Sequence, residues 1–213
     1  MLQDDDVVTT SSESTSILSD RSLIGMKKTR AMAAWAERRG FRTTITERLF
    51  DNATRRRPEE PSIALCGLDN AAGRRALDRA GFDFVVEAGL GRGHHDFRGL
   101  LVHTLPGALS AADLWKDEAG ANQSAAEAAA YRKMLDEGSL DRCGVTLLAG
   151  KAVGAPFVGA VAATLVLAEV LRLLHGGRLH RLIDMNLVDL GHFQSAPQLR
   201  DFSALNPGFV VSG

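Results

Sequence analysis

Two short apolar stretches that enclose a helix-like segment constrain the fold of this 213-residue chain more than any other feature. Residues 62–69 read SIALCGLD and residues 82–91 read FDFVVEAGLG, and both are typical of strands buried on both faces. Between them, NAAGRRALDRAG offers Asn70 as a helix N-cap and Gly81 as a helix end. A strand, a helix and a second strand in such close succession predict two parallel neighbours in one sheet.

The same alternation continues on both sides of this unit. Further strands are expected at 2–8, 42–50, 98–107 and 179–190, and further helices at 27–40 and 153–177. This order predicts an α/β fold, with a Rossmann-like, mostly parallel sheet and flanking helices, over residues 1–190. A small helical insertion is expected at about 107–142, and an irregular C-terminal tail at 191–213.

The longest apolar stretch, Val153 to Gly177, could be mistaken for a membrane span. Glu169 and Arg172 lie inside it, and charges within a span are costly. We therefore expect a helix that is apolar all round and buried in the core, and no membrane as partner.

Charge and cysteine content narrow the class of protein further. The formal net charge of -1 gives no long-range attraction to nucleic acid or to an anionic membrane. Two cysteines, Cys66 and Cys143, cannot build a disulfide framework, which favours a reducing compartment and a cytoplasmic location. Cys66 lies within an apolar strand, so we expect it in the core.

Acidic residues stand where two of the expected strands end. Asp4 and Asp6 follow the first strand and Asp69 follows SIALCGL, while Lys28 begins a helix. Ligands of open α/β sheets bind beyond the carboxyl ends of the strands, where carboxylates can hold ribose hydroxyls or Mg²⁺ and a lysine can neutralise phosphate. The alternative stays open that Asp69 and Asn70 only form a turn or a helix cap, and that the lysine is solvated.

These residues occur within two longer stretches, DDDVVTTSSESTSILSDRSLIGMKKTRAMAAWAE and ALCGLDN, which resemble the ThiF/MoeB family. This is the adenylating fold of ubiquitin-activating enzymes and their bacterial relatives. By this resemblance, Asp4 and Asp6 match an acidic element whose first carboxylate takes the ribose. Lys28 matches a lysine on the ATP phosphates, and the Asp69–Asn70 pair matches a strand end whose aspartate is associated with Mg²⁺.

The resemblance implies an adenylyltransferase that uses ATP and Mg²⁺. Its substrate would be the C-terminal carboxylate of a ubiquitin-like or sulfur-carrier protein, or of a peptide, and the protein would be a homodimer. Asp69 and Lys28 would then be catalytic. Cys143 precedes a glycine roughly where the family places an acyl-accepting cysteine, and a buried, inert thiol is the alternative.

The sequence also departs from the family pattern. It contains no G-x-G-x-x-G phosphate loop, and Thr15 stands where the family carries a phosphate-binding arginine, which a hydroxyl cannot replace. Arg21 could substitute from a shifted position. We therefore also consider a non-catalytic, partner-binding subunit of the same fold, or a fragment whose phosphate loop lies upstream. A nicotinamide-dependent oxidoreductase is less favoured, because the glycine fingerprint is absent and Lys28 begins the helix.

Overall fold

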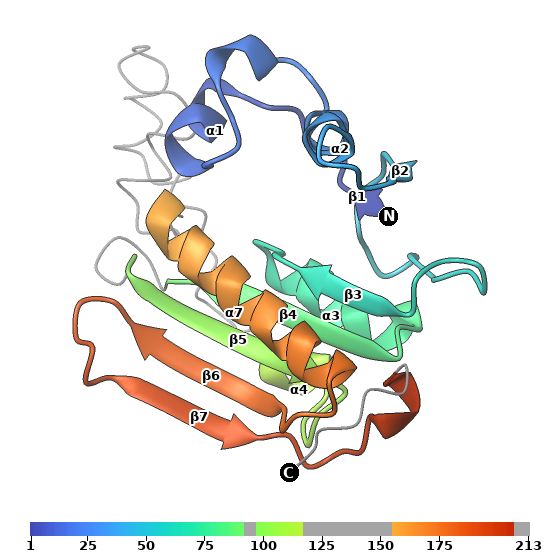
Figure 1. Cartoon of the computed structure of the whole chain (residues 1–213), viewed down its shortest axis with the longest axis vertical. Helices are drawn as coiled ribbons and strands as arrows, with labels where there is room; N and C mark the ends of the chain where they lie inside the picture. The colour runs from blue at the N-terminus through green and yellow to red at the C-terminus, as the bar shows by residue number, and fades with distance from the viewer. Residues whose placement is uncertain (92–96, 117–154, 207–213) are drawn as a thin grey trace.

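The computed structural model describes residues 1–91, 97–116 and 155–206 (Figure 1). Its strands are β1 (Leu2–Gln3), β2 (Ile45–Thr46), β3 (Ile63–Cys66), β4 (Phe84–Leu90), β5 (Gly99–Leu105), β6 (His180–Asn186) and β7 (Phe193–Pro197). Its α-helices are α1 (Thr10–Thr15), α2 (Lys28–Glu37), α3 (Ala71–Ala80), α4 (Ala111–Leu114) and α7 (Pro156–Leu174). Two 3₁₀ turns, η1 (Arg21–Leu23) and η3 (Ser203–Leu205), complete this part of the chain.

The strands form two sheets. One has the order β3-β4-β5-β6-β7, and β1 pairs with β2 in the other. The α/β class with flanking helices is confirmed, and the pairs β1–β2 and β3–β4 are parallel, as expected. From β4 to β7, however, every pairing is antiparallel, which corrects the prediction of a mostly parallel sheet for this half. Residues 91–98 and 187–192 are too short for the crossover that parallel neighbours need.

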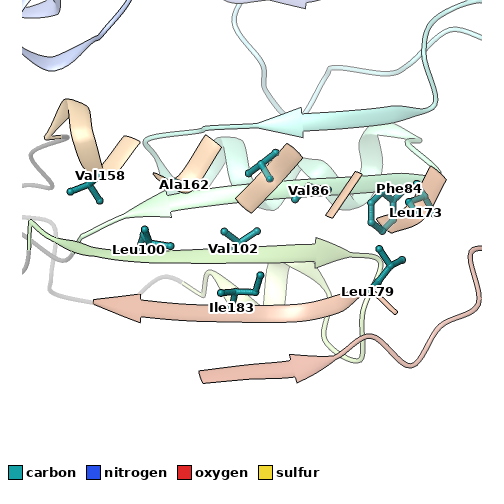
Figure 2. Close-up of a cluster of buried hydrophobic side chains, with 10 residues drawn as sticks. Phe84, Val86, Leu100, Val102, Val158, Ala162, Leu173, Leu179 and Ile183 are labelled. Carbon is teal, nitrogen blue, oxygen red and sulfur yellow. The ribbon is translucent and has the colours of Figure 1, made fainter. Parts of the chain in front are cut away.

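Helices cover both faces of the larger sheet. Figure 1 shows α7 lying across β4 and β5, with α3 and α4 behind the sheet. Side chains alternate along β4, so that Phe84 and Val86 pack against α7 while Val85 packs towards α3 and α4. Figure 2 shows the α7 side of this core, where Val158 and Ala162 of the helix meet the strands.

Helix α7 is less buried than its sequence predicts. Its buried residues form one stripe, Val158, Ala162, Val166, Glu169 and Leu173. The opposite side leaves Phe157, Leu167 and Leu171 about half exposed, which corrects the prediction of a helix buried all round. By length and composition alone, α7 is also long and apolar enough to cross a membrane. In the structure, 28% of the apolar 18-residue stretch of α7 that meets these criteria is buried.

A buried carboxylate ties the end of α7 to the start of β6. Glu169 is fully buried and accepts a 2.9 Å hydrogen bond from the backbone N–H of His180. Its Oε1 lies 2.6 Å from Nη1 of Arg172 and 2.9 Å from Nδ1 of His180. A buried charge is retained only when it is compensated in this way, so these contacts fix the helix to the strand.

One further expectation changes in the structure. The C-terminal tail is not wholly irregular, because Phe193–Pro197 form β7 on the edge of the larger sheet. Thr10–Thr15 form a short helix, although Ser and Thr residues there give little propensity for one. Of the expected insertion at 107–142, α4 is present at Ala111–Leu114, and residues 117–142 lie outside the described residues.

Candidate functional site

The first acidic element forms a compact group with the start of α2. A carboxylate oxygen of Asp4 accepts a 2.8 Å hydrogen bond from the backbone N–H of Asp6. The ammonium group of Lys28 lies 2.7 Å from Oδ2 of Asp6, and its backbone N–H donates to the Asp6 carbonyl at 3.0 Å. The structure therefore brings these three residues together, and it pairs the lysine with a carboxylate of its own chain.

The second acidic element stands at the start of α3. Asn70 caps this helix, because its side-chain oxygen accepts a 2.7 Å hydrogen bond from the backbone N–H of Gly73. Its amide nitrogen donates to Oδ1 of Asp69 at 3.1 Å, and Asp69 itself is exposed. The cap interpretation of Asn70 is thus confirmed, while Asp69 presents a carboxylate to solvent just beyond β3.

The two acidic elements belong to different sheets. Asp4 follows β1 of the two-stranded sheet, whereas Asp69 follows β3 at the edge of the larger sheet. Within the described residues, the side-chain contacts of Asp69 go to Asn70 and those of Lys28 go to Asp6. No hydrogen bond or ion pair that the described residues make therefore joins the two elements.

The segment that aligns with the family's arginine loop is the short helix α1. Thr15 donates its hydroxyl hydrogen to the carbonyl of Ser11 at 2.9 Å, so its side chain serves the helix. Arg21, the possible substitute, is an exposed side chain whose Nε lies 3.1 Å from Oε1 of Glu13. The Nε–H of Arg21 is thus engaged by Glu13 and not directed at a ligand.

The structure describes one of the two cysteines, Cys66. Cys143, the possible acyl acceptor, lies outside the described residues. Cys66 is packed against the core between the sheet and α3, as expected. Burial, and to a lesser extent the charge of Glu87, raises the pKa of the Cys66 thiol to about 12, which keeps it protonated and unreactive near neutral pH.

A pocket that the sequence did not reveal lies on the face of the larger sheet opposite α7. Its volume is about 560 Å³, and its polar lining consists of Arg74, His103, Trp115, Asp184, Asn186 and His192. The ring of Trp115 packs edge-on against His103, with centroids 5.2 Å apart, and lies 5.6 Å from the Arg74 guanidinium carbon. The arginine and the imidazoles offer hydrogen-bond donors beside an aromatic ring, and Asp184 offers an acceptor, so the lining suits a ligand that carries both polar groups and a flat or apolar group.

The buried carboxylate of Glu87 lies beneath this pocket and contacts two of the polar residues that line it. It is 1% exposed, its Oε1 lies 2.8 Å from Nε of Arg74, and its Oε2 lies 3.6 Å from Nδ1 of His103. Among the described residues, no well-aligned hydrogen bond reaches either carboxylate oxygen, so the contact with Arg74 is an ion pair. The signal for this cluster was a lone ionisable residue within each of two apolar strands, VVEAGL and LLVHTL.

The pocket and Asp69 lie at the same end of the sheet, the one where the carboxyl ends of β3 and β4 meet. Gly89, Leu90 and Gly91, at the carboxyl end of β4, line the pocket. Because β3 and β4 are parallel, their carboxyl ends meet at the same edge, and Asp69 comes three residues after β3. This is the edge at which ligands of α/β sheets bind.

The described side chains do not form a site that could hold a metal ion without further ligands. Within residues 1–91, 97–116 and 155–206, no three His, Cys, Asp or Glu side chains come close enough to hold an ion. A single exposed carboxylate such as Asp69 does fit Mg²⁺ that keeps its waters and also binds phosphate oxygens.

Comparisons with known proteins bear on both the fold and the family. Residues 1–177 match the family model described as the BilD C-terminal domain. A relative from Collimonas sp. (strain OK412), "Bacterial E1-like protein BilD", is 42% identical over 97% of this chain and 46% of its own length. The chain thus spans about half the length of the curated relative it matches.

Solved structures of Escherichia coli MccB share the fold. One has a TM-score of 0.59 at 15% identity, over 93% of this chain and 55% of MccB. Another, of MccB with AMPCPP and MccA, has a TM-score of 0.55 at 13% identity, over 93% of this chain and 56% of that one. The resemblance to the adenylating fold is confirmed at this coarser level, with BilD in place of ThiF/MoeB as the matched family. The chain belongs to the BilD C-terminal domain family.

Proposed function

We propose that this chain handles the nucleotide and the acyl substrate in an E1-like adenylating enzyme. A carboxylate oxygen of the substrate attacks the α-phosphorus of ATP, the bond from that phosphorus to the β-phosphate oxygen breaks, and acyl-adenylate and pyrophosphate result. The observation that carries the proposal is the common edge of Asp69 and the pocket, in a chain of the BilD family. Catalysis of this kind consists mainly of positioning and charge neutralisation.

The nucleotide would lie along the acidic elements. Asp4 would accept hydrogen bonds from the ribose, and Lys28 would turn from Asp6 towards the phosphates, a change that breaks only a half-exposed ion pair. Asp69, with Asn70 holding its Oδ1, would hold Mg²⁺ through its carboxylate. The ion, when bound, would neutralise phosphate charge.

The acyl substrate would enter the pocket beside this edge. A ubiquitin-like or sulfur-carrier protein, or a peptide, could place its terminal carboxylate there, with the Arg74 guanidinium as the nearest cation. The solved MccB complex with AMPCPP and MccA supports a nucleotide and a second ligand on this fold. Transfer of the acyl group from the adenylate to Cys143, which would release AMP and form a thioester, remains part of the proposal.

Exchange of labelled pyrophosphate into ATP, measured on the protein at its full natural length, tests the proposal. Asp69→Asn keeps a turn-forming side chain and removes the charge, so exchange should be lost while the melting temperature stays almost unchanged. Asp201→Asn is the matched control, because Asp201 is, like Asp69, an exposed aspartate, and it does not line the pocket. Exchange at the original rate in Asp69→Asn would show that this residue has no role with the metal.

A second candidate is a non-catalytic subunit that binds a partner through the same pocket. It is favoured by the pairing of Lys28 with Asp6 and by the engagement of Thr15 within α1. Calorimetric titration with ATP and Mg²⁺ separates the two candidates. No heat at millimolar ATP from the folded protein would remove the enzymatic function and leave the binding one.

Two broader expectations stay predictions. The small number of cysteines supports a cytoplasmic location. The resemblance to the ThiF/MoeB family supports a homodimer. Fractionation of cells and light scattering of the purified protein would test them.

A further inference from the structure

The guanidinium of Arg74 lies in space that a missing side chain leaves open on β4. A Cβ atom placed on Gly89 would lie 3.0 Å from Nη2 of Arg74 and 3.4 Å from its Cζ, so the guanidinium would have to give way. Gly89 does not have a positive φ, and its backbone would therefore accept a side chain. The glycine is thus required for the close approach of the arginine and not for the conformation of the strand.

A buried carboxylate on the same strand engages the other end of the same group. Glu87 comes two residues before Gly89 and therefore faces the same side of β4. Its Oε1 lies 2.8 Å from Nε of Arg74, and its side chain is 1% exposed. A buried charge is costly unless an opposite charge stays beside it, so Glu87 keeps the arginine in place. Because Nε faces Glu87, the edge formed by Nη1 and Nη2 remains for a ligand.

An aromatic ring borders the guanidinium on a third side. The ring centroid of Trp115 lies 5.6 Å from the guanidinium carbon of Arg74, within the range of a cation–π interaction. The carbonyl of Trp115 accepts a 2.9 Å hydrogen bond from Nη1 of Arg75, and Asp78 accepts hydrogen bonds from the first two backbone N–H groups of α4. Helix α3 therefore provides the arginine and also holds the segment that carries the aromatic ring.

Polarity changes from one side of the pocket to the other. In the antiparallel register, Gly89 pairs with Leu101, and Leu101 pairs with Asp184. The strand positions of Gly89 and Asp184 are therefore two strand spacings, about 10 Å, apart on the same face of the sheet. A ligand anion is attracted by Arg74 above β4 and repelled by Asp184 on β6. The anionic end of a ligand consequently belongs on the β4 side of the pocket.

We propose that Glu87 and Gly89 are positioning residues, which fix the Arg74 guanidinium as a receptor for a carboxylate joined to a flat or apolar group. The carboxylate accepts two parallel hydrogen bonds from Nη1 and Nη2, and the flat group lies against Trp115. The inference rests on the proposed function, since the acyl substrate presents its carboxylate to the same guanidinium. It adds two residues of β4 that act through the arginine.

Fixing the arginine in advance favours binding. A long side chain that becomes ordered only when the ligand arrives loses its rotamer freedom at that moment, and this loss weakens the affinity. Here Glu87 and the space above Gly89 restrict the side chain of Arg74 before any ligand is present. A substitution that displaces the guanidinium and keeps its charge should therefore weaken the binding of a carboxylate.

Titration of benzoate into the isotope-labelled protein, followed by NMR without nucleotide, tests this inference. The Nε–H signal of Arg74 and the indole N–H signal of Trp115 should shift and saturate with benzoate. They should respond much less to benzamide, which has the same ring and no charge. Arg74→Lys identifies the arginine signal, and this variant should lose most of the binding, because an ammonium group lacks the planar fork.

Two variants then test the positioning residues. Gly89→Ala should raise the dissociation constant for benzoate about tenfold, because its Cβ displaces the guanidinium. The displaced group is the end of a flexible side chain, so the melting temperature should hardly change. Glu87→Asp keeps the negative charge and withdraws it by one methylene, and it should weaken binding about threefold.

Gly159→Ala is the matched control for Gly89→Ala. Gly159 lies on α7, on the opposite face of the sheet, and a Cβ there would meet Cδ1 of Leu90 at 3.9 Å, an ordinary contact. Benzoate binding should therefore stay unchanged in this variant.

Three results would overturn the inference. Benzoate could leave the Arg74 signal unshifted, benzamide could bind as tightly as benzoate, or Gly89→Ala could bind benzoate like the unaltered protein. Unchanged affinity in Glu87→Asp would overturn the role assigned to Glu87. Because the titration contains no ATP, a protein that binds benzoate through Arg74 and does not exchange pyrophosphate would contradict the proposed adenylation alone.

Discussion

Removal of the Glu169 carboxylate should destabilise the fold more than any surface ion pair could. In Glu169→Ala, the partly buried N–H of His180 loses its acceptor and Arg172 loses its partner. Hydrogen bonds to a charged group contribute about 1.5–3 kcal/mol each, and a buried donor left without a partner adds its desolvation cost. The Arg172 side chain is 40% exposed and can return to water, so its share is discounted. We expect a total loss of about 3 kcal/mol.

Urea denaturation followed by circular dichroism measures this loss directly. The midpoint should fall while the slope stays constant, because the surface exposed on unfolding hardly changes. For a domain of this size, the same loss lowers the melting temperature by about 6–12 °C. Glu169→Gln keeps an acceptor for the His180 N–H and should cost about half as much.

The control is the exposed ion pair between Glu13 and Arg21. Its atoms are 3.1 Å apart, but the arginine is 84% exposed, so Glu13→Ala should cost about 0.5 kcal/mol or less. A Glu169→Ala protein within about 1 kcal/mol of the unaltered chain would refute the reasoning, because burial would then not distinguish the two pairs.

Two further predictions concern Asn70 and Cys66. Asn70→Ala removes the cap of α3 and should cost about 1 kcal/mol in urea denaturation, whereas Asn70→Asp, which keeps an acceptor for the Gly73 N–H, should cost little; equal losses would argue against the cap. With the pKa of the Cys66 thiol at about 12, the thiolate is about 1 in 10,000 at pH 8, and its fraction rises tenfold per pH unit up to that pKa. Alkylation at Cys66 by iodoacetamide, followed by mass spectrometry, should therefore be about a thousandfold slower in the folded protein than in urea, and equal rates would contradict the assigned burial.

Local sequence predicted the elements whose signals are local. Asn70 and Gly81 bound α3 as expected, and Gly81 adopts a φ of 85°, which a side chain would oppose. The apolar runs around β3, β4, β5 and β6 each contain a strand, because such runs must be buried to be stable. The candidate carboxylates were likewise visible as residues that follow strands.

Other features depended on distant parts of the chain. The segment FQSAP becomes β7 only because β6 offers it an edge, since its own residues are mostly exposed and carry no apolar pattern. The pocket was missed because Arg74, Glu87 and His103 come from a helix and two strands, and nothing in their spacing predicts that they meet.

The sequence by itself determined where the core strands β3 to β6 and the helices α2, α3 and α7 form and which carboxylates end the strands, because burial, capping and turn preferences act over a few residues. Only the tertiary structure decided the strand directions after β4, the exposed side of α7, and the separation of Asp4 from Asp69 into two sheets. Pairing partners and packing faces are selected by contacts between remote segments, and a local pattern carries no record of which segment it will meet.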